Sequence, residues 1–294
     1  MTVKDLLTEY LSELSDEGAR ALQVDYQLRP LTCLIGHKEL TDLTARGLEE
    51  YRRARREQTT RYGTPPAHAT INRELGYFRA ALNRAWKRGD LPAVPWIRMA
   101  KENGRRYDWC PVEVLEAILA RLRERQCHEV IADLVEAYFF TGWRRRELLE
   151  LTWREVRLTA REPLIELPAE RSKSGEPRVF PLGGRLLAGF ERRLAARWGD
   201  FVWHRRGRPI RDFRRLWQRV AAEVGHPGLC VHGMRRTFAF YSVSAGTPQS
   251  ITMRLAGWQT DSIFRRYMIY PDRLLRKHAA STERYIRDEW RGAV

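Results

Sequence analysis

Apolar residues recur at helical spacing along most of the chain, between short polar stretches that contain Pro or Gly. Thr2 suits the N-cap of a first helix, whose apolar positions end before the polar stretch 15–18. A second helix is predicted over 41–56, with a basic end that suits the helix dipole. A third helix ends at Gly89, a typical C-terminal glycine. Its apolar face carries Ile71, Leu75, Phe78, Leu82 and Trp86.

The second part of the chain keeps the helical pattern but contains two short apolar segments typical of strands, 164–167 and 178–182. The segment 171–177 between them predicts a hairpin with Lys173 at its tip. Helices are predicted from Pro111 and over 130–140, 184–198, 212–224, 235–245, 251–256, 262–270 and 272–290. The fold is therefore predicted to be mainly α, with a small antiparallel sheet in the second part.

Residues 90–109 interrupt these patterns and divide the chain in two. Their two prolines are followed by Lys101, Arg105 and Arg106, which is typical of an interdomain linker lying along a phosphate backbone. A length of 294 residues fits two domains of ordinary size. We expect a helical domain over 1–100, a basic linker over 101–108 and an α+β domain over 109–294.

Basic residues exceed acidic ones along the whole chain, with 53 Lys and Arg against 37 Asp and Glu. This excess favours a protein that binds a polyanion, although a merely basic protein is the alternative on charge alone. The four cysteines form no Cys-x-x-Cys pair, so neither zinc nor a disulfide framework is indicated. With no signal peptide and no apolar run of about 18 residues, we expect a cytoplasmic, nucleoid-associated protein without a membrane partner.

Three consecutive arginines begin a predicted helix in the segment Thr-Gly-Trp-Arg-Arg-Arg-Glu that starts at residue 141. Backbone N–H groups and the helix dipole favour an anion there, and a guanidinium binds two phosphate oxygens at once. Glu147 is placed to orient Arg144. Helical periodicity does not distinguish which of Arg144, Arg145 and Arg146 faces inward, and a solvated basic helix is the alternative interpretation.

His232 and Arg235 lie one helical turn apart and share a face. The imidazole can exchange a proton, and the guanidinium adds positive charge to the same oxygens. Lys173 is placed to protonate a leaving alkoxide from its turn, although loop lysines are usually only solvated. Metal ligands are missing beside these cations in the sequence, so phosphoryl transfer there requires a protein nucleophile.

In this order and spacing the motifs resemble the tyrosine recombinase, or phage integrase, family. Its Thr-Gly-Leu-Arg is matched by residues 141–144, which selects Arg144, and its hairpin lysine by Lys173. Its His-x-Leu-Arg-x-Thr-Phe is matched by residues 232–238, with Met in place of Leu. Its Leu-Gly-His is matched by residues 256–258, where Trp is a known variant of the His.

The resemblance also identifies a candidate nucleophile, because the family's catalytic tyrosine lies nine residues beyond the end of the motif at residues 256–258. That position is Tyr267; Tyr270 is disfavoured by the same spacing, and Tyr285 is expected to be a packing residue of the last helix. Trp258 is expected to pack at the site and to donate its indole N–H to the phosphate.

The implied reaction uses no metal, ATP or other cofactor. Tyr267 would attack the scissile phosphate to form a 3′-phosphotyrosine, and His232 would assist because a phenol with an ordinary pKa near 10 is poorly ionised. Arg144 and Arg235 would stabilise the phosphorane, and Lys173 would protonate the leaving 5′-oxygen. A second 5′-hydroxyl could then attack the ester and complete strand exchange.

The first hundred residues share the resemblance. Residues 70–75 and 85–89 are similar to the last helix of the integrase core-binding, SAM-like domain of mobile-element and phage enzymes, and no separate arm-binding domain is expected before it. The family implies a two-domain, C-shaped clamp on duplex DNA, with the catalytic domain over 109–294. Candidate DNA contacts are Asn72, Arg73, Arg79, Lys87, Lys101, Arg105 and Arg106.

Family members act as synaptic tetramers on DNA and use accessory DNA-bending or directionality factors, which are therefore expected partners. Residues 272–290 are a candidate docking segment, which would pack either against a neighbouring subunit or against its own subunit. Its residues available for burial are Leu274, Leu275, Ile286 and Trp290.

Two other functions fit the same residues: a type IB topoisomerase-like enzyme that only relaxes DNA, and a catalytically silent DNA-binding protein of this fold. The match over 72–89 argues against the topoisomerase. The presence of all the candidate catalytic groups argues against the silent protein.

Overall fold

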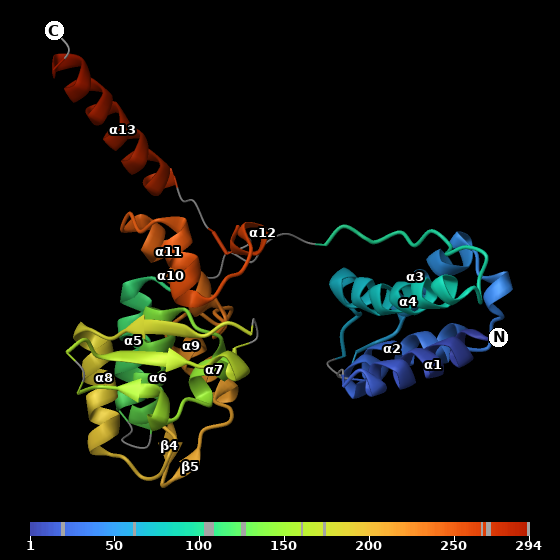
Figure 1. Cartoon of the computed structure of the whole chain (residues 1–294), viewed down its shortest axis with the longest axis horizontal. Helices are drawn as coiled ribbons and strands as arrows, with labels where there is room; N and C mark the ends of the chain where they lie inside the picture. The colour runs from blue at the N-terminus through green and yellow to red at the C-terminus, as the bar shows by residue number, and fades with distance from the viewer. Residues whose placement is uncertain are drawn as a thin grey trace. The chain divides into compact units, whose positions relative to one another are not determined.

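The fold is mainly helical, with two small antiparallel sheets, and forms two compact units, Met1–Gly104 and Arg105–Val294 (Figure 1). This confirms the predicted fold class. The structure, a computed structural model, describes residues 1–18, 21–60, 63–102, 109–124, 128–159, 161–172, 175–265, 267–268 and 272–292.

The first unit is a bundle in which α1 packs against α2 and α4, and α2 also contacts α3. Its elements are α1 (Val3–Asp16), α2 (Ala21–Ile35), the 3-10 turn η1 (Leu40–Asp42), α3 (Ala45–Glu57) and α4 (His68–Arg88). Thr2 caps α1 as predicted: its hydroxyl accepts from the Asp5 N–H, and the Asp5 carboxylate accepts from the Thr2 N–H. Gly89 ends α4 with φ of 90°, a conformation that strains residues with a Cβ.

Three features of this unit correct the sequence-based prediction. Helix α2 was not predicted, because Pro30 interrupts a pattern whose buried residues nevertheless follow helical spacing. The helix predicted over 41–56 begins only at Ala45, where the Thr44 hydroxyl accepts from the Gly47 N–H and caps it. Trp86, predicted on the apolar face of α4, is 50% exposed.

Two polar contacts join parts of the first unit. Arg55 in α3 forms a buried ion pair with Glu74 in α4 at 3.0 Å, and the Tyr51 hydroxyl donates to the same carboxylate. The amide of Asn72 holds the segment after α4, since Nδ2 donates to the Ala100 carbonyl and Oδ1 accepts from the Ala100 N–H, both at 2.9 Å. The chain up to residue 100 is therefore fastened to this unit.

The second unit is built around α6 (Glu129–Thr141), which is buried on nearly all sides. It contacts α5 (Val112–Arg123), α7 (Arg145–Leu149), α8 (Gly184–Ala195) and α10 (Gly233–Ser244). The other helical elements are the 3-10 turns η3 (Trp153–Glu155) and η4 (Ala169–Arg171), and α9 (Arg214–Glu223), α11 (Gln249–Ala256), α12 (Asp261–Phe264) and α13 (Asp272–Gly292). No helix among the described residues is long and apolar enough to cross a membrane.

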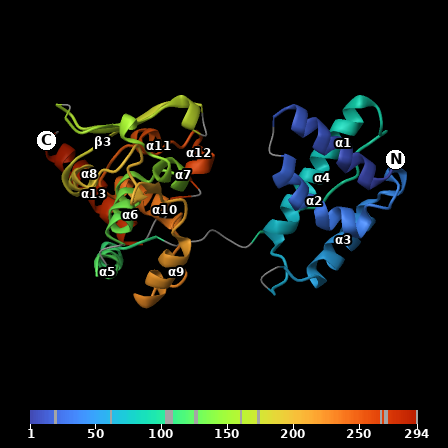
Figure 2. The ribbon, with the colours of Figure 1, turned by 90° about the horizontal axis from the view of Figure 1, so that it is seen from below.

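The sheet of the second unit lies on one side of these helices (Figures 1 and 2). Its antiparallel strands, in chain order, are β1 (Val156–Arg157), β2 (Leu164–Leu167) and β3 (Arg178–Pro181). Strands β2 and β3 are the predicted hairpin, but the predicted tip residue Lys173 lies outside the described residues. Arg178 pairs with the buried Leu167 and shares its inward face, so its side chain enters the core. A second hairpin, β4 (His204–Arg205) with β5 (Arg208–Pro209), was not predicted.

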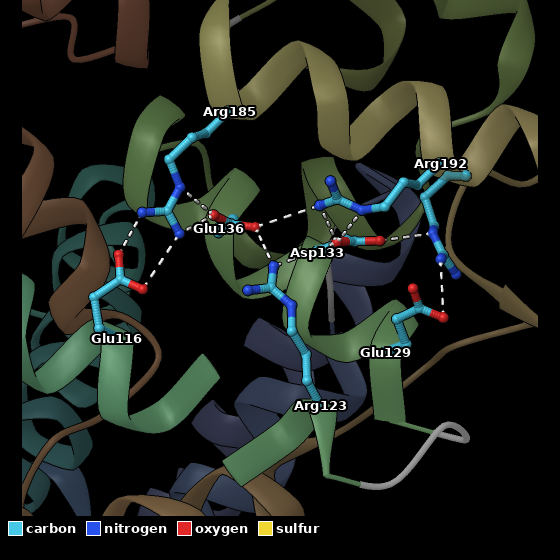
Figure 3. A network of polar contacts seen from close by, with 8 residues as sticks. Glu116, Arg123, Glu129, Asp133, Glu136, Arg185 and Arg192 are labelled. Atoms are coloured by element: carbon cyan, nitrogen blue, oxygen red, sulfur yellow. Dashed lines mark hydrogen bonds and ion pairs between the residues drawn. The ribbon is translucent and has the colours of Figure 1, made fainter. Parts of the chain in front are cut away.

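Two buried carboxylates interrupt the apolar surface of α6 and bind arginines of α5 and α8 (Figure 3). Asp133 forms ion pairs with Arg192 at 2.6 Å and with Arg193 at 2.7 Å. Glu136 forms ion pairs with Arg185 at 2.6 Å and with Arg123 at 2.7 Å. Buried charges persist only when they are paired, so this network fixes α5 and α8 on α6.

Near the C-terminus the structure corrects two predictions. The helix predicted over 262–270 is shorter, because α12 ends at Phe264 and Tyr267 lies in the turn that follows. Helix α13 matches the predicted range, but Tyr285, predicted to pack, is exposed. Tyr270 lies outside the described residues.

Candidate active site

Arg144 is held at the junction between α6 and α7. Its backbone N–H donates to Glu147 Oε2 and its Nη1 to Glu147 Oε1, both at 2.8 Å, while Nη2 donates to the Gly257 carbonyl at 3.1 Å. The next two arginines point elsewhere: Arg145 pairs with Asp212, and Arg146 with Glu150. Of the three consecutive arginines, Arg144 is therefore the one directed towards the turn after α11.

Arg235 in α10 reaches the same turn from within the core, and it is only 3% exposed. Its Nη1 donates to the carbonyls of Gly142 and Ala256, each at 2.6 Å, and its Nη2 to that of Gly257. Burial, together with the nearby charge of Arg144, lowers the pKa of Arg235 to about 9. Carbonyl oxygens accept from both Nη atoms but leave the charge of the guanidinium uncompensated, which favours an anion at this point.

His232 and Tyr267 meet at the exposed side of this cluster. The Tyr267 hydroxyl lies 3.0 Å from His232 Nε2, at hydrogen-bonding distance. The guanidinium carbon of Arg235 lies 5.8 Å from the centre of the Tyr267 ring, and that of Arg236 lies 5.9 Å from it. The phenol thus has both an imidazole nitrogen and positive charge beside it.

Trp258 follows Gly257, which ends α11 with φ of 74°. The Arg235 guanidinium lies 4.1 Å from the centre of the Trp258 ring, and the Tyr267 ring centre lies 5.2 Å from it. Trp258 is 5% exposed, and its indole N–H has no hydrogen-bond partner among the described residues. Such a buried donor calls for an explanation, and an oxygen of a bound ligand would satisfy it. A cleft of about 750 Å³ adjoins Trp258 and Gly257.

The structure thus brings together six of the residues predicted from the sequence: Arg144, Glu147, His232, Arg235, Trp258 and Tyr267. The remaining catalytic candidate, Lys173, lies outside the described residues, as do Arg105 and Arg106. Arg73, Arg79, Lys87 and Lys101 are exposed residues of the first unit. The side-chain amide of Asn72 is hydrogen-bonded to the backbone of Ala100 within that unit.

Sequence analysis missed one further residue of this cluster, Arg178 at the start of β3. It forms an ion pair with Glu147 at 2.7 Å and donates to the Ala256 carbonyl at 2.5 Å. The signal was present, since Arg178 alternates with Val179 and falls on the face of the strand occupied by Phe180.

The site combines a cluster of arginines with a contact between a tyrosine hydroxyl and a histidine. Arg144 and Arg178 share the carboxylate of Glu147, and Arg235 has no carboxylate partner among the described residues, which leaves a positive excess in a largely buried cluster. This arrangement can bind a phosphate and stabilise negative charge that develops on it, beside a tyrosine hydroxyl in contact with a histidine. Among the described residues, no group of three or more His, Cys, Asp or Glu side chains is placed to hold a metal ion.

Comparison with known proteins decides the family. Residues 109–270, more than half of the chain, match the sequence profile of the phage integrase family. The chain belongs to this family. The integrase of Salmonella phage P22 is 25% identical over 232 residues, which cover 73% of this chain and 57% of that integrase. The integrase of Haemophilus phage HP1 is 25% identical over 275 residues, which cover 86% of this chain and 71% of that protein.

Solved integrase structures share the fold at 16% sequence identity. The Tn1549 transposon integrase in complex with circular intermediate DNA aligns with a TM-score of 0.73, over 92% of this chain and 96% of that one. A lambda integrase dimer bound to a COC′ core site aligns with a TM-score of 0.74, over 91% and 77% of the two chains. The resemblance predicted from the motifs is confirmed at the level of family and fold.

Proposed function

We propose that this phage integrase family member is a site-specific DNA recombinase, which cleaves and rejoins duplex DNA through a 3′-phosphotyrosine without metal or ATP. The observation that carries the proposal is the contact between the Tyr267 hydroxyl and His232 Nε2, beside the guanidinium of Arg235, whose charge no carboxylate among the described residues neutralises. A nucleophile, a proton acceptor and an anion site thus lie within one cluster, which is what phosphoryl transfer to a protein side chain requires.

In the first step, the Tyr267 oxygen attacks the scissile phosphorus while His232 Nε2 takes the phenolic proton. The P–O bond to the 5′-oxygen breaks, and Lys173 supplies the proton that this oxygen needs to leave as a hydroxyl. Arg144 and Arg235 stabilise the charge that accumulates on the phosphorane oxygens. The indole N–H of Trp258, which has no partner in the described part of the chain, donates to one of those oxygens.

In the second step, a 5′-hydroxyl attacks the phosphotyrosine and gives its proton to Lys173. The P–O bond to the tyrosine breaks, and His232 returns the phenolic proton to Tyr267. Bond number and type are conserved, since one phosphodiester is exchanged for a phosphotyrosine ester and then restored. Attack by the 5′-hydroxyl of a partner strand gives exchange, and attack by the original one gives relaxation or no net change. Recombination therefore also requires an assembly that holds two DNA sites together.

Duplex DNA is the proposed partner of both units, which we propose to be the core-binding and catalytic domains. The exposed cations Arg73, Arg79 and Lys87 all lie on α4 and have no carboxylate partner among the described residues, so they are available to phosphates. For Asn72 we propose a different role, because its amide already holds the chain at Ala100. It would position the start of the linker rather than contact DNA.

We also propose that α13 docks onto a neighbouring subunit in a tetramer. Leu275, Ile286 and Trp290 are exposed in the single chain, with Trp290 at 73%. The solved lambda integrase tetramer is bound to a Holliday junction. Removal of the residues beyond Asp272 should spare cleavage of one site and weaken the pairing of two sites; unchanged pairing would contradict the role of α13.

The proposed chemistry is tested with a suicide substrate, made from DNA that the protein selects from a random library and nicked so that cleavage cannot be reversed. Wild type should form a covalent adduct, Tyr267→Phe should form none, and Tyr270→Phe and Tyr285→Phe should behave as wild type. Absence of adduct on every selected DNA would favour the silent DNA-binding protein. Relaxation of plasmids irrespective of sequence would favour the topoisomerase-like enzyme.

A further inference from the structure

Arg178 is a buried cation that the mechanism above does not use. It is the first residue of β3, where it pairs with Leu167 and faces the core, and it is 7% exposed. Its guanidinium lies 5.1 Å from the centre of the Trp143 ring. Burial of a charge is costly, and here burial lowers the pKa of Arg178 despite the opposing effect of Glu147. The fold tolerates this cost at a position that strands usually fill with an apolar residue.

Arg178 contacts the same two groups that hold the phosphate-binding arginines, the Glu147 carboxylate and the Ala256 carbonyl. Glu147 Oε2 lies 2.7 Å from Arg178 Nη2, while Oε1 accepts from Arg144 at 2.8 Å. The Ala256 carbonyl accepts from Arg178 at 2.5 Å and from Arg235 at 2.6 Å. Arg178 therefore links β3 to the supports of both Arg144 and Arg235.

Arg178 also lies against the turn that precedes Trp258. A Cβ added to Gly257 would lie 1.5 Å from Arg178 Nη1 and 2.4 Å from its Cζ. The Gly257 carbonyl in turn accepts from Arg144 at 3.1 Å and from Arg235 at 3.3 Å. The guanidinium of Arg178 thus packs against the glycine whose carbonyl both phosphate-binding arginines share.

The division of Glu147 between two arginines affects charge as well as position. A carboxylate bound to Arg144 alone would neutralise that arginine and compete with a phosphate for its N–H groups. Because Oε2 of Glu147 also forms an ion pair with Arg178, the charge of this carboxylate is shared between two guanidiniums while Arg144 stays oriented. Transition-state stabilisation depends on such preorganised and uncompensated charge.

We propose that Arg178 is a positioning residue for strand cleavage. It fixes Glu147 and the Ala256–Gly257 carbonyls so that Arg144 and Arg235 point at the scissile phosphate, and it draws part of the Glu147 charge away from Arg144. The inference rests on the proposed function, and it assigns to Arg178 no contact with the DNA. Arg178 acts on the rate of the chemical step through its neighbours.

The test compares Arg178→Met and Arg178→Lys with Arg157→Met, which removes an exposed arginine of the same sheet. Phosphotyrosine formation is followed in single turnover on the suicide substrate over a range of DNA concentrations. At saturating DNA the Arg178→Met rate should fall by about 10- to 100-fold, with less than about a threefold change in the half-saturating concentration. Arg178→Lys should restore part of the rate, because an ammonium keeps the charge but cannot bind both acceptors as a guanidinium fork does. Arg157→Met should match wild type.

A purely structural role gives a different result. It would lower the thermal stability and the fraction of molecules that react, while the molecules that do react would keep the wild-type rate. That outcome, or an unchanged rate in folded Arg178→Met, overturns the inference. The proposed function would still be supported by the Tyr267-dependent adduct of wild type.

Crystal structures of wild type and Arg178→Met test the inference without any activity. Displacement of the Arg144 guanidinium and of the Gly257 carbonyl supports it, and their retention overturns it. Absence of adduct in wild type would count against the proposed function, and the two structures would still decide whether Arg178 positions these groups.

Discussion

The hydroxyl of Tyr267 lies 3.0 Å from Nε2 of His232, although the two residues come from separate elements, the start of α10 and the turn after α12. The contact predicts that His232→Ala slows phosphotyrosine formation, because the phenolic proton loses its acceptor. A loss of about 10²- to 10⁴-fold is expected for removal of a general base. The measurement is the single-turnover rate at saturating DNA. His226→Ala, which removes an exposed histidine, should react as fast as wild type; equal rates for both variants would exclude a role for His232.

Gly257 and Gly246 both have positive φ, at 74° and 88°, but only Gly257 faces a close neighbour. An added Cβ would lie 1.5 Å from Arg178 Nη1 at Gly257, whereas nothing lies within 4 Å of it at Gly246. Both alanine variants should lose about 1–2 kcal/mol to backbone strain. Gly257→Ala should lose about 1–3 kcal/mol more, because Arg178 must move.

Urea unfolding of the two glycine variants measures this difference, and the cleavage rate of each folded variant measures its effect on the site. Gly257→Ala should also cleave more slowly, since displaced Arg178 no longer holds the Ala256 carbonyl. Equal stability losses would show that the turn adjusts without disturbing Arg178.

Local patterns predicted the longer elements because each of these helices repeats its apolar spacing over several turns. Helix α4 shows this well, with Leu75, Phe78 and Leu82 buried on one face. The pattern failed where Pro30 interrupts α2, and where strands of two residues, such as β4 and β5, are too short to alternate. It also extended α12 too far, since Tyr267 lies in a turn that tertiary contacts determine.

The site was predicted to the extent that its residues are close in sequence or match a family motif. Arg144 and Glu147 are three residues apart, so their contact follows from local geometry. Tyr267 was predicted only through the resemblance, because no local sequence pattern places it near His232. Strand alternation indicates that Arg178 faces inward, but its role could not be assigned, since its partners Glu147 and Ala256 are distant in sequence and its role depends on the carbonyl of a residue with no polar side chain.

The buried carboxylate of Asp133 should be important for stability, because it is shared by Arg192 and Arg193 within the core face of α6. Asp133→Asn removes the closest counter-charge of both guanidiniums, which keep only contacts of 3.6 Å to Glu136 and Glu129. The expected cost is about 3–5 kcal/mol in the free energy of unfolding. Glu116→Gln, which breaks an exposed ion pair with Arg185 in the same network (Figure 3), should cost less than about 1 kcal/mol. Urea titration of both variants checks the prediction, which fails if Asp133→Asn is no less stable than Glu116→Gln.

Stability at low pH should depend on Glu147. Burial acts to raise the pKa of this carboxyl, but Arg178 and Arg144 outweigh it and hold the pKa below its usual value. A carboxyl whose pKa is lower in the folded protein stabilises the fold at pH values above its unfolded pKa, near 4.3, and loses that contribution as the pH falls through the folded pKa. Wild type should therefore be more stable than Glu147→Gln at about pH 6, and the difference should shrink towards about pH 3. Urea unfolding across this range measures it, with Glu150→Gln, an exposed carboxylate of the same segment, as the control. A difference that stays constant as the pH falls would show that Glu147 acts through its shape and hydrogen bonds rather than through its charge.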